Sequence, residues 1–331
     1  MDDTEFADVV VATDGSEPAT AAVETGLSLA TALGARLHAC TVVDPFAIGQ
    51  RLPDLRAARE EADERVAAIA ERAREAGVDA EPVVREGTPH RELSAYVDDV
   101  GADLLVIGTH GRGGGRRALL GSVAEKLVRT VQVPVIVVHG DDRPGEDGPI
   151  WADAAEIVLA TDGSDVAAPA ERTGVALADA LGARLTAVSV VDESGTVANV
   201  GGGLLTGETI AAVRRALDER ATDAVGRVVE RAREAGVEAA GEVLGGEPSR
   251  AICGYASDAG ADLIVVGTHG RGGIRRVVLG SVAERVIRGA DRPVLVVPSA
   301  AGDLAENEAE TDAEAEANAE AETEAEPTTE G

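Results

Sequence analysis

Residues 108–125 read GTHGRGGGRRALLGSVAE, and residues 267–284 read GTHGRGGIRRVVLGSVAE. In each stretch a glycine-rich loop follows an apolar strand and ends where a helix is predicted to begin. Such a loop gathers backbone N–H groups around an anion, and the positive end of the helix dipole faces the same space. We therefore expect a phosphate-binding loop that occurs twice in one chain.

The repetition extends over most of the sequence. ATDGS at 12–16 recurs 148 residues later, and ERAREAGV at 71–78 recurs 159 residues later. The matches stay in step on either side of this change, so the second copy carries a local insertion of 11 residues between Asp192 and Glu230. The chain is therefore expected to contain two copies of one module.

The composition between and after the copies predicts the domain boundaries. A polar, turn-forming stretch separates the copies, and the last residues are rich in Ala and Glu, with twelve acidic residues and no basic ones. A segment with so little to bury is expected to be disordered. The predicted parts are a first module at 1–139, a linker at 140–154, a second module at 155–299 and an acidic tail at 300–331.

Each copy alternates buried strands with amphipathic helices, which is the pattern of a parallel sheet covered by helices on both faces. Gly77 is a predicted helix C-cap. In the first copy the pattern predicts strands at 8–13, 36–43, 78–84, 103–108 and 134–138, and helices at 18–33, 55–76, 88–100 and 122–131. The second copy is expected to repeat this α/β order from 157 to 297.

The charge excludes several kinds of partner. The formal net charge is −30, and Lys126 is the only lysine among 30 basic residues. A general nucleic-acid or anionic-membrane binder needs a basic surface, so neither is expected. The excess of acidic residues and the near absence of lysine resemble the composition of proteins from salt-loving organisms. Molar salt there reduces the range of charge repulsion, the Debye length, to about 3 Å.

The remaining composition gives three further expectations. Cys40 and Cys253 occupy non-equivalent places and have no CxxC partner, so neither a disulfide framework nor a zinc site is expected. The sequence starts MDDTE, acidic where a secretion signal is basic, and contains no apolar run long enough to span a membrane. We expect a soluble, cytoplasmic protein.

Two interpretations apply to the serines that precede the last helix of each copy. Ser122 with Glu125, and Ser281 with Glu284, fit the S-x-x-E capping box, in which the serine hydroxyl accepts from its own helix. The same hydroxyl at the helix start also suits a phosphate. Each loop adds three arginines and no acid, at 112, 116, 117 and at 271, 275, 276, which favours an anion for the loop as a whole.

Asp14 and Asp162 follow the first strand of each copy, in TDGS. D-G is a turn signal, and the aspartate or the serine there suits a helix cap. The alternative is a carboxylate that accepts from ribose hydroxyls or base, as in dinucleotide folds. If strand one neighbours strand four, both loops lie at one switch point of the sheet, which favours the ligand interpretation.

Both copies resemble the universal stress protein family, over nearly all of 7–139 and 155–298. The resemblance rests on G-x2-G-x9-G-S, the TDGS loop, the V-V-D that ends strand two, and GADLLVIG and GADLIVVG. It implies five parallel strands in the order 3-2-1-4-5, a Rossmann-like fold, and modules that pair through their fifth strands. The resemblance also implies that copies that keep the glycines belong to the branch that binds ATP. The implied contacts in the first copy are Asp14, Val42, Gly108, Gly111, Arg112, Gly121, Ser122 and Val123, and in the second Asp162, Val190, Gly267, Gly270, Arg271, Gly280, Ser281 and Val282.

The resemblance predicts two ATP sites, an intramolecular pseudo-dimer and a role in stress response or signalling, with the protein partner and any further homodimer left open. Mg²⁺ or Mn²⁺ would enter only through the phosphates, since no spacing suggests protein metal ligands, and His110 and His269 are read as polar loop residues.

Two alternative functions stay open. An enzyme of related fold would need an HxGH or SGGxDS loop where TDGS stands, and no catalytic residue is assigned; an interaction protein would not need the glycines. The segment 194–208 is either a lid or a surface insertion.

Overall fold

The computed structural model describes residues 6–47, 52–109, 120–139, 155–192, 207–268 and 279–299. The glycine-rich stretches 110–119 and 269–278, the predicted linker and the segment 193–206 lie outside the described residues. The predicted acidic tail, 300–331, is a separate unit and also lies outside them.

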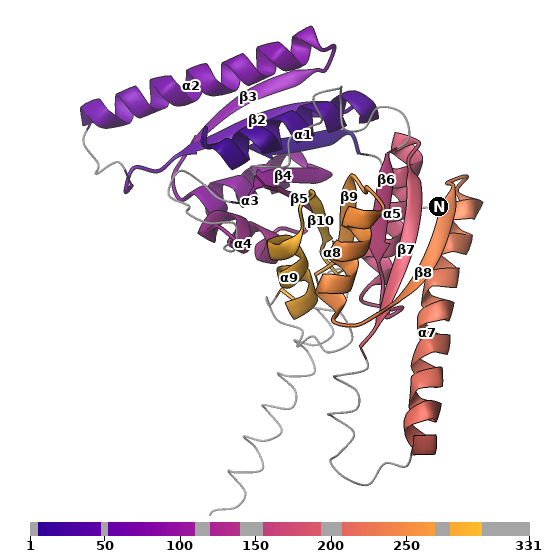
Figure 1. The fold of residues 1–331 in the computed structure, drawn as a ribbon. Helices are drawn as coiled ribbons and strands as arrows, with labels where there is room; N and C mark the ends of the chain where they lie inside the picture. The colour runs from indigo at the N-terminus through magenta and orange to yellow at the C-terminus, as the bar shows by residue number, and fades with distance from the viewer. Residues whose placement is uncertain are drawn as a thin grey trace, which may run out of the picture. The chain divides into compact units, whose positions relative to one another are not determined.

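The described elements follow the predicted α/β order in both modules (Figure 1). The first module consists of β1 (Asp8–Ala12), α1 (Glu17–Leu33), β2 (Arg36–Val43), α2 (Leu52–Glu75), β3 (Ala80–Glu86), α3 (Pro89–Val100), β4 (Leu104–Gly108), α4 (Ser122–Thr130) and β5 (Val135–Val138). The second consists of β6 (Glu156–Ala160), α5 (Ala168–Leu181), β7 (Arg184–Val191), α7 (Gly207–Glu234), β8 (Ala239–Gly245), α8 (Pro248–Asp258), β9 (Leu263–Gly267), α9 (Ser281–Gly289) and β10 (Val294–Val297).

The strands that the structure describes form one sheet of ten, in the order β3-β2-β1-β4-β5-β10-β9-β6-β7-β8. Within each module every pairing is parallel, and the order is the predicted 3-2-1-4-5. The predicted fold class is therefore confirmed. The fifth strands pair with each other in the antiparallel sense, with Leu295 opposite Ile136, so the two five-stranded sheets are continuous.

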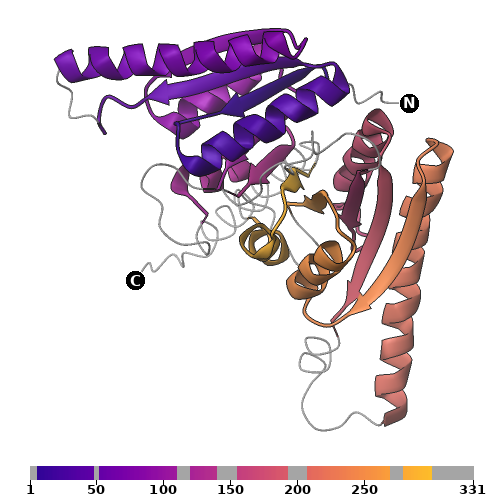
Figure 2. The same ribbon diagram turned by 45° about the horizontal axis from the view of Figure 1, so that its top comes forward.

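Alternate residues of each strand enter two apolar layers. Val9 and Val11 pack on one face of β1 and Val10 on the other, because successive side chains of a strand point to opposite faces. Residues of α1, α2, α5 and α7 complete the first layer, and residues of α3, α4, α8 and α9 complete the second. Figure 2 shows this for the second module, in which α7 and α8 lie on opposite sides of the strands.

The matched aspartates of the GAD motifs fix the beginning of the first strand in each module. Asp103 accepts hydrogen bonds from the backbone N–H groups of Ala7 and Asp8, both at 2.9 Å. Asp262 accepts from the N–H of Glu156 at the same distance. These aspartates join strand one to strand four at their amino ends, which is a structural role.

The predicted boundaries differ from the observed ones by a few residues. The predicted third strand begins at Val78, whereas β3 begins at Ala80, because the Val78 N–H donates to the carbonyl of Ala73 and completes the end of α2. Gly77 adopts a left-handed conformation, with φ +83°, which confirms it as the glycine that ends this helix.

Candidate functional site

The carboxyl ends of strands one and four lie side by side in each module. Val11 of β1 is in register with Val106 of β4, and Leu159 of β6 with Val265 of β9. The TDGS loop and the glycine-rich stretch therefore leave the sheet at the same edge, where the strand order reverses. In open α/β sheets ligands bind at this switch point.

Gly108 is required by the close approach of α1. A Cβ at this position would lie 2.6 Å from the backbone carbonyl carbon of Pro18 and 2.8 Å from the nitrogen of Ala19. The end of β4 is thus in contact with the start of α1, immediately beyond the TDGS loop. A residue predicted to approach phosphate has, in this structure, a packing reason to be glycine.

The two ends of each undescribed glycine-rich stretch meet. The N–H of Gly121 donates to the carbonyl of Thr109 at 2.6 Å, and the N–H of Gly280 donates to that of Thr268 at 2.7 Å. Both threonines are buried, and both directly follow strand four. The helix that ends the stretch therefore begins at the edge where strand four ends.

The predicted capping boxes are wrong. Gly121 and Gly280 are the N-cap residues, with φ/ψ of −62°/149° and −60°/144°, so each serine is the first residue inside its helix. Neither cap carries a side-chain hydrogen bond. Glu125 pairs with Arg129 at 2.8 Å and Glu284 with Arg288 at 2.6 Å, one turn further along, instead of reaching back to the helix start.

The helix starts offer main-chain donors. The first hydrogen bond inside α4 runs from Glu125 N–H to Gly121 C=O, so the N–H groups of Ser122, Val123 and Ala124 have no carbonyl acceptor within the helix. The same follows in α9, where Glu284 donates to Gly280. Ser122 and Ser281 are exposed, so their hydroxyls lie beside these donors at a solvent-accessible helix end.

Asp14 and Asp162 accept hydrogen bonds within turns, and the N-cap residues of the following helices are Ser16 and Ala167. The N–H of Ser16 donates to Asp14 Oδ1, and that of Ser164 to Asp162 Oδ1, both at 3.0 Å. In the first module Ser16, and not Asp14, caps α1 by accepting from the N–H of Ala19. Both aspartates are partly exposed at the edge where strand one ends.

The four predicted valines lie on one face of the sheet. Val42 and Val190, near the ends of their strands, and Val123 and Val282, in the first turns of α4 and α9, are half-buried. All four pack against the apolar layer that α3, α4, α8 and α9 cover. Each module thus presents an apolar strand residue on the same face as its helix start.

The structure does not place every predicted residue. Gly108, Gly121, Ser122 and Val123 meet at one edge, as do Gly267, Gly280, Ser281 and Val282 in the second module. Gly111, Arg112, Gly270 and Arg271 lie outside the described residues, as do His110, His269 and the other arginines of the two stretches.

The sequence did not predict one buried acid of the second module, Glu171. Glu171, in the first turn of α5, is only 4% exposed. Its carboxylate accepts from the Thr161 hydroxyl at 2.6 Å and from Arg231 at 2.9 Å. Thr161 directly precedes Asp162. The signal was present in the comparison of the copies, because the position equivalent to Glu171 is Val23.

His38 is also buried, at the opposite edge of the sheet. Its Nδ1 lies 2.7 Å from the Tyr96 hydroxyl and its Nε2 lies 2.9 Å from Asp8 Oδ1. These contacts connect β1, β2 and α3 near the amino ends of the strands. The histidine therefore has a packing role away from the predicted site.

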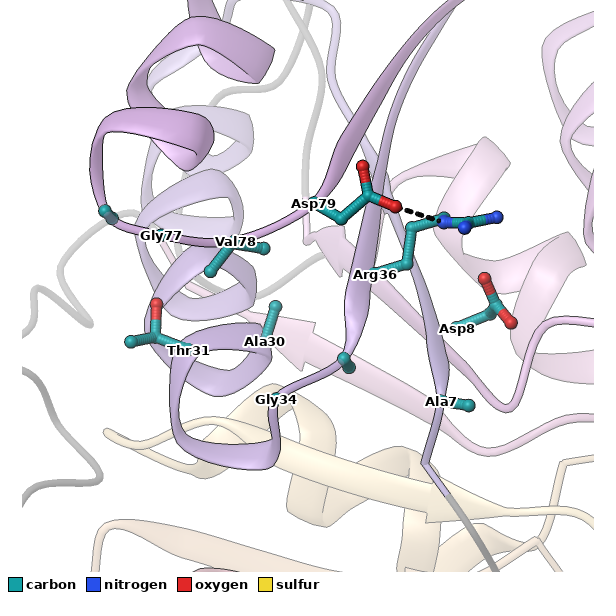
Figure 3. Close-up of a pocket in the computed structure, with 11 residues that line it drawn as sticks. Ala7, Asp8, Ala30, Thr31, Gly34, Arg36, Gly77, Val78 and Asp79 are labelled. Atoms are coloured by element: carbon teal, nitrogen blue, oxygen red, sulfur yellow. Dashed lines mark hydrogen bonds and ion pairs between the residues drawn. The ribbon is translucent and has the colours of Figure 1, made fainter.

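A hollow of about 540 Å³ lies at that same amino edge in the first module. Arg36 pairs with Asp79 at 2.9 Å beside it. Figure 3 shows this pair, with Gly34 and Gly77 at the ends of α1 and α2. No residue predicted for the phosphate site lines this hollow. The hollow and the predicted site are on opposite edges of the sheet.

The described residues contain no group of three or more His, Cys, Asp or Glu arranged to hold a metal ion. Both cysteines are free, and burial raises the pKa of Cys40 to about 12 and that of Cys253 to about 11. Among the helices that the structure describes, none combines the length and the hydropathy needed to cross a membrane.

Fold and site together define a class: a pair of doubly wound α/β modules, each with a helix start and an acidic turn at its switch point. The sequence profile of the universal stress protein family matches residues 5–139 and 155–298. The chain therefore belongs to the universal stress protein family, with two of its domains in tandem.

Individual relatives support this family assignment. A universal stress protein of Methanocaldococcus jannaschii is 41% identical over 142 residues, which cover 43% of this chain and 81% of the relative. One of Mycolicibacterium smegmatis is 34% identical over 202 residues, 59% of this chain and 62% of the relative. The crystal structure of a universal stress protein from Archaeoglobus fulgidus shares the fold, with a TM-score of 0.65, 22% identity, and coverage of 90% of this chain and 98% of that one.

Proposed function

We propose that each module binds one molecule of ATP, or of a related adenine nucleotide, at the carboxyl edge of its first and fourth strands. The observation that carries this proposal is the matched pair of helix starts at Ser122 and Ser281, whose N–H groups lack intrahelical acceptors at a switch point. These donors and the serine hydroxyls would hold the phosphates.

The ribose and the base of the nucleotide would bind at the ends of the first two strands of each module. Asp14 and Asp162 are partly exposed where strand one ends, and a carboxylate there accepts from ribose hydroxyls. Val42 and Val190 offer an apolar surface to the base. A divalent cation, Mg²⁺ or Mn²⁺, would enter through the phosphate oxygens.

The proposed role is stress response or signalling through nucleotide-dependent partners, and not rapid catalysis, since no residue is assigned to acid–base or nucleophilic chemistry. Continuous pairing of β5 with β10 supports two modules that act as an intramolecular pseudo-dimer. The acid excess supports a protein adapted to high salt. Fast turnover of ATP with a defined acceptor would contradict the binding role.

A pair of substitutions at one position tests the phosphate contact. Ser122→Ala removes the hydroxyl, whereas Ser122→Pro removes the hydroxyl and the N–H. Proline suits the first position of a helix, and the extended conformation of Gly121 is the one that a residue before proline prefers. The fold should therefore survive both changes.

The N–H should account for an additional loss in the proline variant. A hydrogen bond to a charged group contributes about 1.5–3 kcal/mol, so Ser122→Pro should bind ATP at least about tenfold more weakly than Ser122→Ala. The measurement is equilibrium dialysis with ATP in molar KCl, on variants in which Ser281 is already proline. Equal affinities of the alanine and proline variants would count against a main-chain phosphate contact.

A further inference from the structure

A buried acid, Glu171, forms hydrogen bonds that hold the TDGS loop of the second module in place. Glu171 is 4% exposed, and burying a carboxylate is unfavourable unless it is paired and hydrogen-bonded. Both its oxygens are engaged, one by the Thr161 hydroxyl at 2.6 Å and the other by Arg231 Nη1 at 2.9 Å. The acid thus links the last residue before Asp162 to helix α7.

The same loop has further connections to that helix. The Thr161 hydroxyl oxygen accepts from the N–H of Gly163 at 3.0 Å, and Arg227 Nη2 donates to the carbonyl of Gly163 at 3.2 Å. Gly163 has φ +69°, and a Cβ there would lie 2.6 Å from the Cβ of Ala224. The two neighbours of Asp162, Thr161 and Gly163, are therefore held by contacts to Glu171 of α5 and Arg227 of α7.

The first module lacks this arrangement. Val23 stands where the second module has Glu171, and exposed Ala68 stands where it has Arg227. Arg72, the counterpart of Arg231, instead pairs with the half-exposed Glu24 at 2.7 Å. The Thr13 hydroxyl accepts from the Gly15 N–H at 3.2 Å.

The helices that follow the two loops also differ. In the first module α1 begins at Glu17 with a Ser16 cap, directly after the loop. In the second module α5 begins at Ala168, three residues later by alignment of the copies, and its N-cap Ala167 provides no side-chain bond. The second loop is thus less closely anchored by its own helix and depends on contacts from α7.

We propose that Glu171, through its bonds to Thr161 and Arg231, is a positioning residue for the nucleotide site of the second module. This inference rests on the proposed function. It makes the two sites unequal: Asp162 is held in its binding position by α7, whereas Asp14 is held by the start of α1. Nucleotide binding in the second module is thereby coupled to α7, the helix that contains Arg227 and Arg231.

The test uses Glu171→Val, which installs the residue that the first module carries at this buried place. In a Ser122→Pro background, which leaves the second site intact, the ATP affinity of the second site should fall by roughly tenfold, a usual size for coupling between positions. The matched control is Arg72→Leu in a Ser281→Pro background, which removes the surface pair of the first module. The affinity of the first site should not change.

A second pair of variants distinguishes a loss of ATP binding from a loss of folding. Thr161→Val removes the hydroxyl that bridges Glu171 and Gly163, and Thr161→Ser keeps it. The positioning role predicts weaker ATP binding by the valine variant and recovery by the serine variant. Folded Glu171→Val and Thr161→Val proteins that bind ATP at the second site as tightly as their parent, with only a lower unfolding temperature, would overturn the inference. Absence of ATP binding by the unsubstituted protein would instead overturn the proposed function.

Discussion

The backbone N–H of Gly121 donates to the carbonyl oxygen of Thr109 at 2.6 Å, which joins the start of α4 to the end of β4. Gly280 and Thr268 make the same contact in the second module, at 2.7 Å. A main-chain hydrogen bond therefore joins the beginning of each helix to the end of strand four. The direction in which the first-turn N–H groups point is a property of the fold, and phosphate binding would require little rearrangement there.

Gly108→Ala should destabilise the first module. The added Cβ meets the backbone of Pro18 and Ala19, which cannot turn aside as a flexible side chain would, and overpacking of this kind costs about 1–3 kcal/mol. Chemical denaturation in molar KCl gives the free energy of unfolding. The control is Gly254→Ala in α8, where a Cβ meets nothing within 4 Å and should stabilise the helix by about 0.5–1 kcal/mol. Similar effects of the two substitutions would show that α1 does not approach β4 as described.

Helix α8 should lose stability on Glu247→Ala. Glu247 is its N-cap and accepts from the Arg250 N–H at 3.0 Å, and loss of such a cap costs about 1 kcal/mol. The equivalent Thr88 makes no side-chain cap bond in α3. Glu247→Gln keeps an acceptor without the charge and should have a smaller effect. Thermal unfolding at neutral pH measures both.

The effect of Glu247 should also depend on pH. Burial opposes ionisation, but hydrogen bonds from Ser249 and Arg250, with the charge of Arg285, lower the pKa of this carboxyl below its usual value. Its contribution is therefore complete above the unfolded pKa of about 4.3 and is lost as the pH falls through the lowered folded pKa. The stability difference between wild type and Glu247→Ala should shrink over that acidic interval; a difference that grows there would contradict the assignment.

Neither thiol should react readily in the folded protein. Burial raises the pKa of Cys40 to about 12 and that of Cys253 to about 11, and only the thiolate is nucleophilic. A disulfide reagent at pH 8 should therefore modify both thiols much more slowly in the folded protein than after denaturation. Because Cys40 is fully buried, it should be the slower of the two in the folded state. Rapid modification of Cys40 in the folded protein would mean that β2 opens easily.

Salt should stabilise the fold. A formal net charge of −30 leaves strong repulsion that salt screens, with a Debye length of about 30 Å at 0.01 M and 3 Å at 1 M. The unfolding temperature should rise with KCl concentration. A chain truncated after Ser299 loses twelve acidic residues and should need less salt for the same stability. An unfolding temperature that is independent of KCl would argue against adaptation to high salt.

The alternation of apolar strands and amphipathic helices predicted most of the fold. β2 has its predicted ends at Arg36 and Val43, because Gly34 precedes and Asp44-Pro45 follows a run that is apolar at most of its positions. The order of the strands is not contained in such a pattern and was predicted from the family resemblance. Boundaries such as the start of β3 depend on backbone bonds at a helix end, which hydropathy does not reveal.

The site was harder to predict at the level of single bonds. S-x-x-E is compatible with a serine at the cap or one residue inside the helix, and only the conformation of Gly121 separates these two cases. Glu171 resembles any charged residue in a first helical turn, where acids are common. Its burial depends on Arg231, which lies 60 residues away in the sequence.

The number of ATP molecules bound per chain tests the central claim most directly. Equilibrium dialysis in molar KCl should give two equivalents for the unsubstituted protein, one for Ser122→Pro or Ser281→Pro alone at concentrations that saturate the intact site, and close to none for the double variant. The matching alanine variants should retain more binding at every concentration. Two equivalents bound as tightly by the double proline variant as by the unsubstituted protein, or none bound by the latter, would contradict the account.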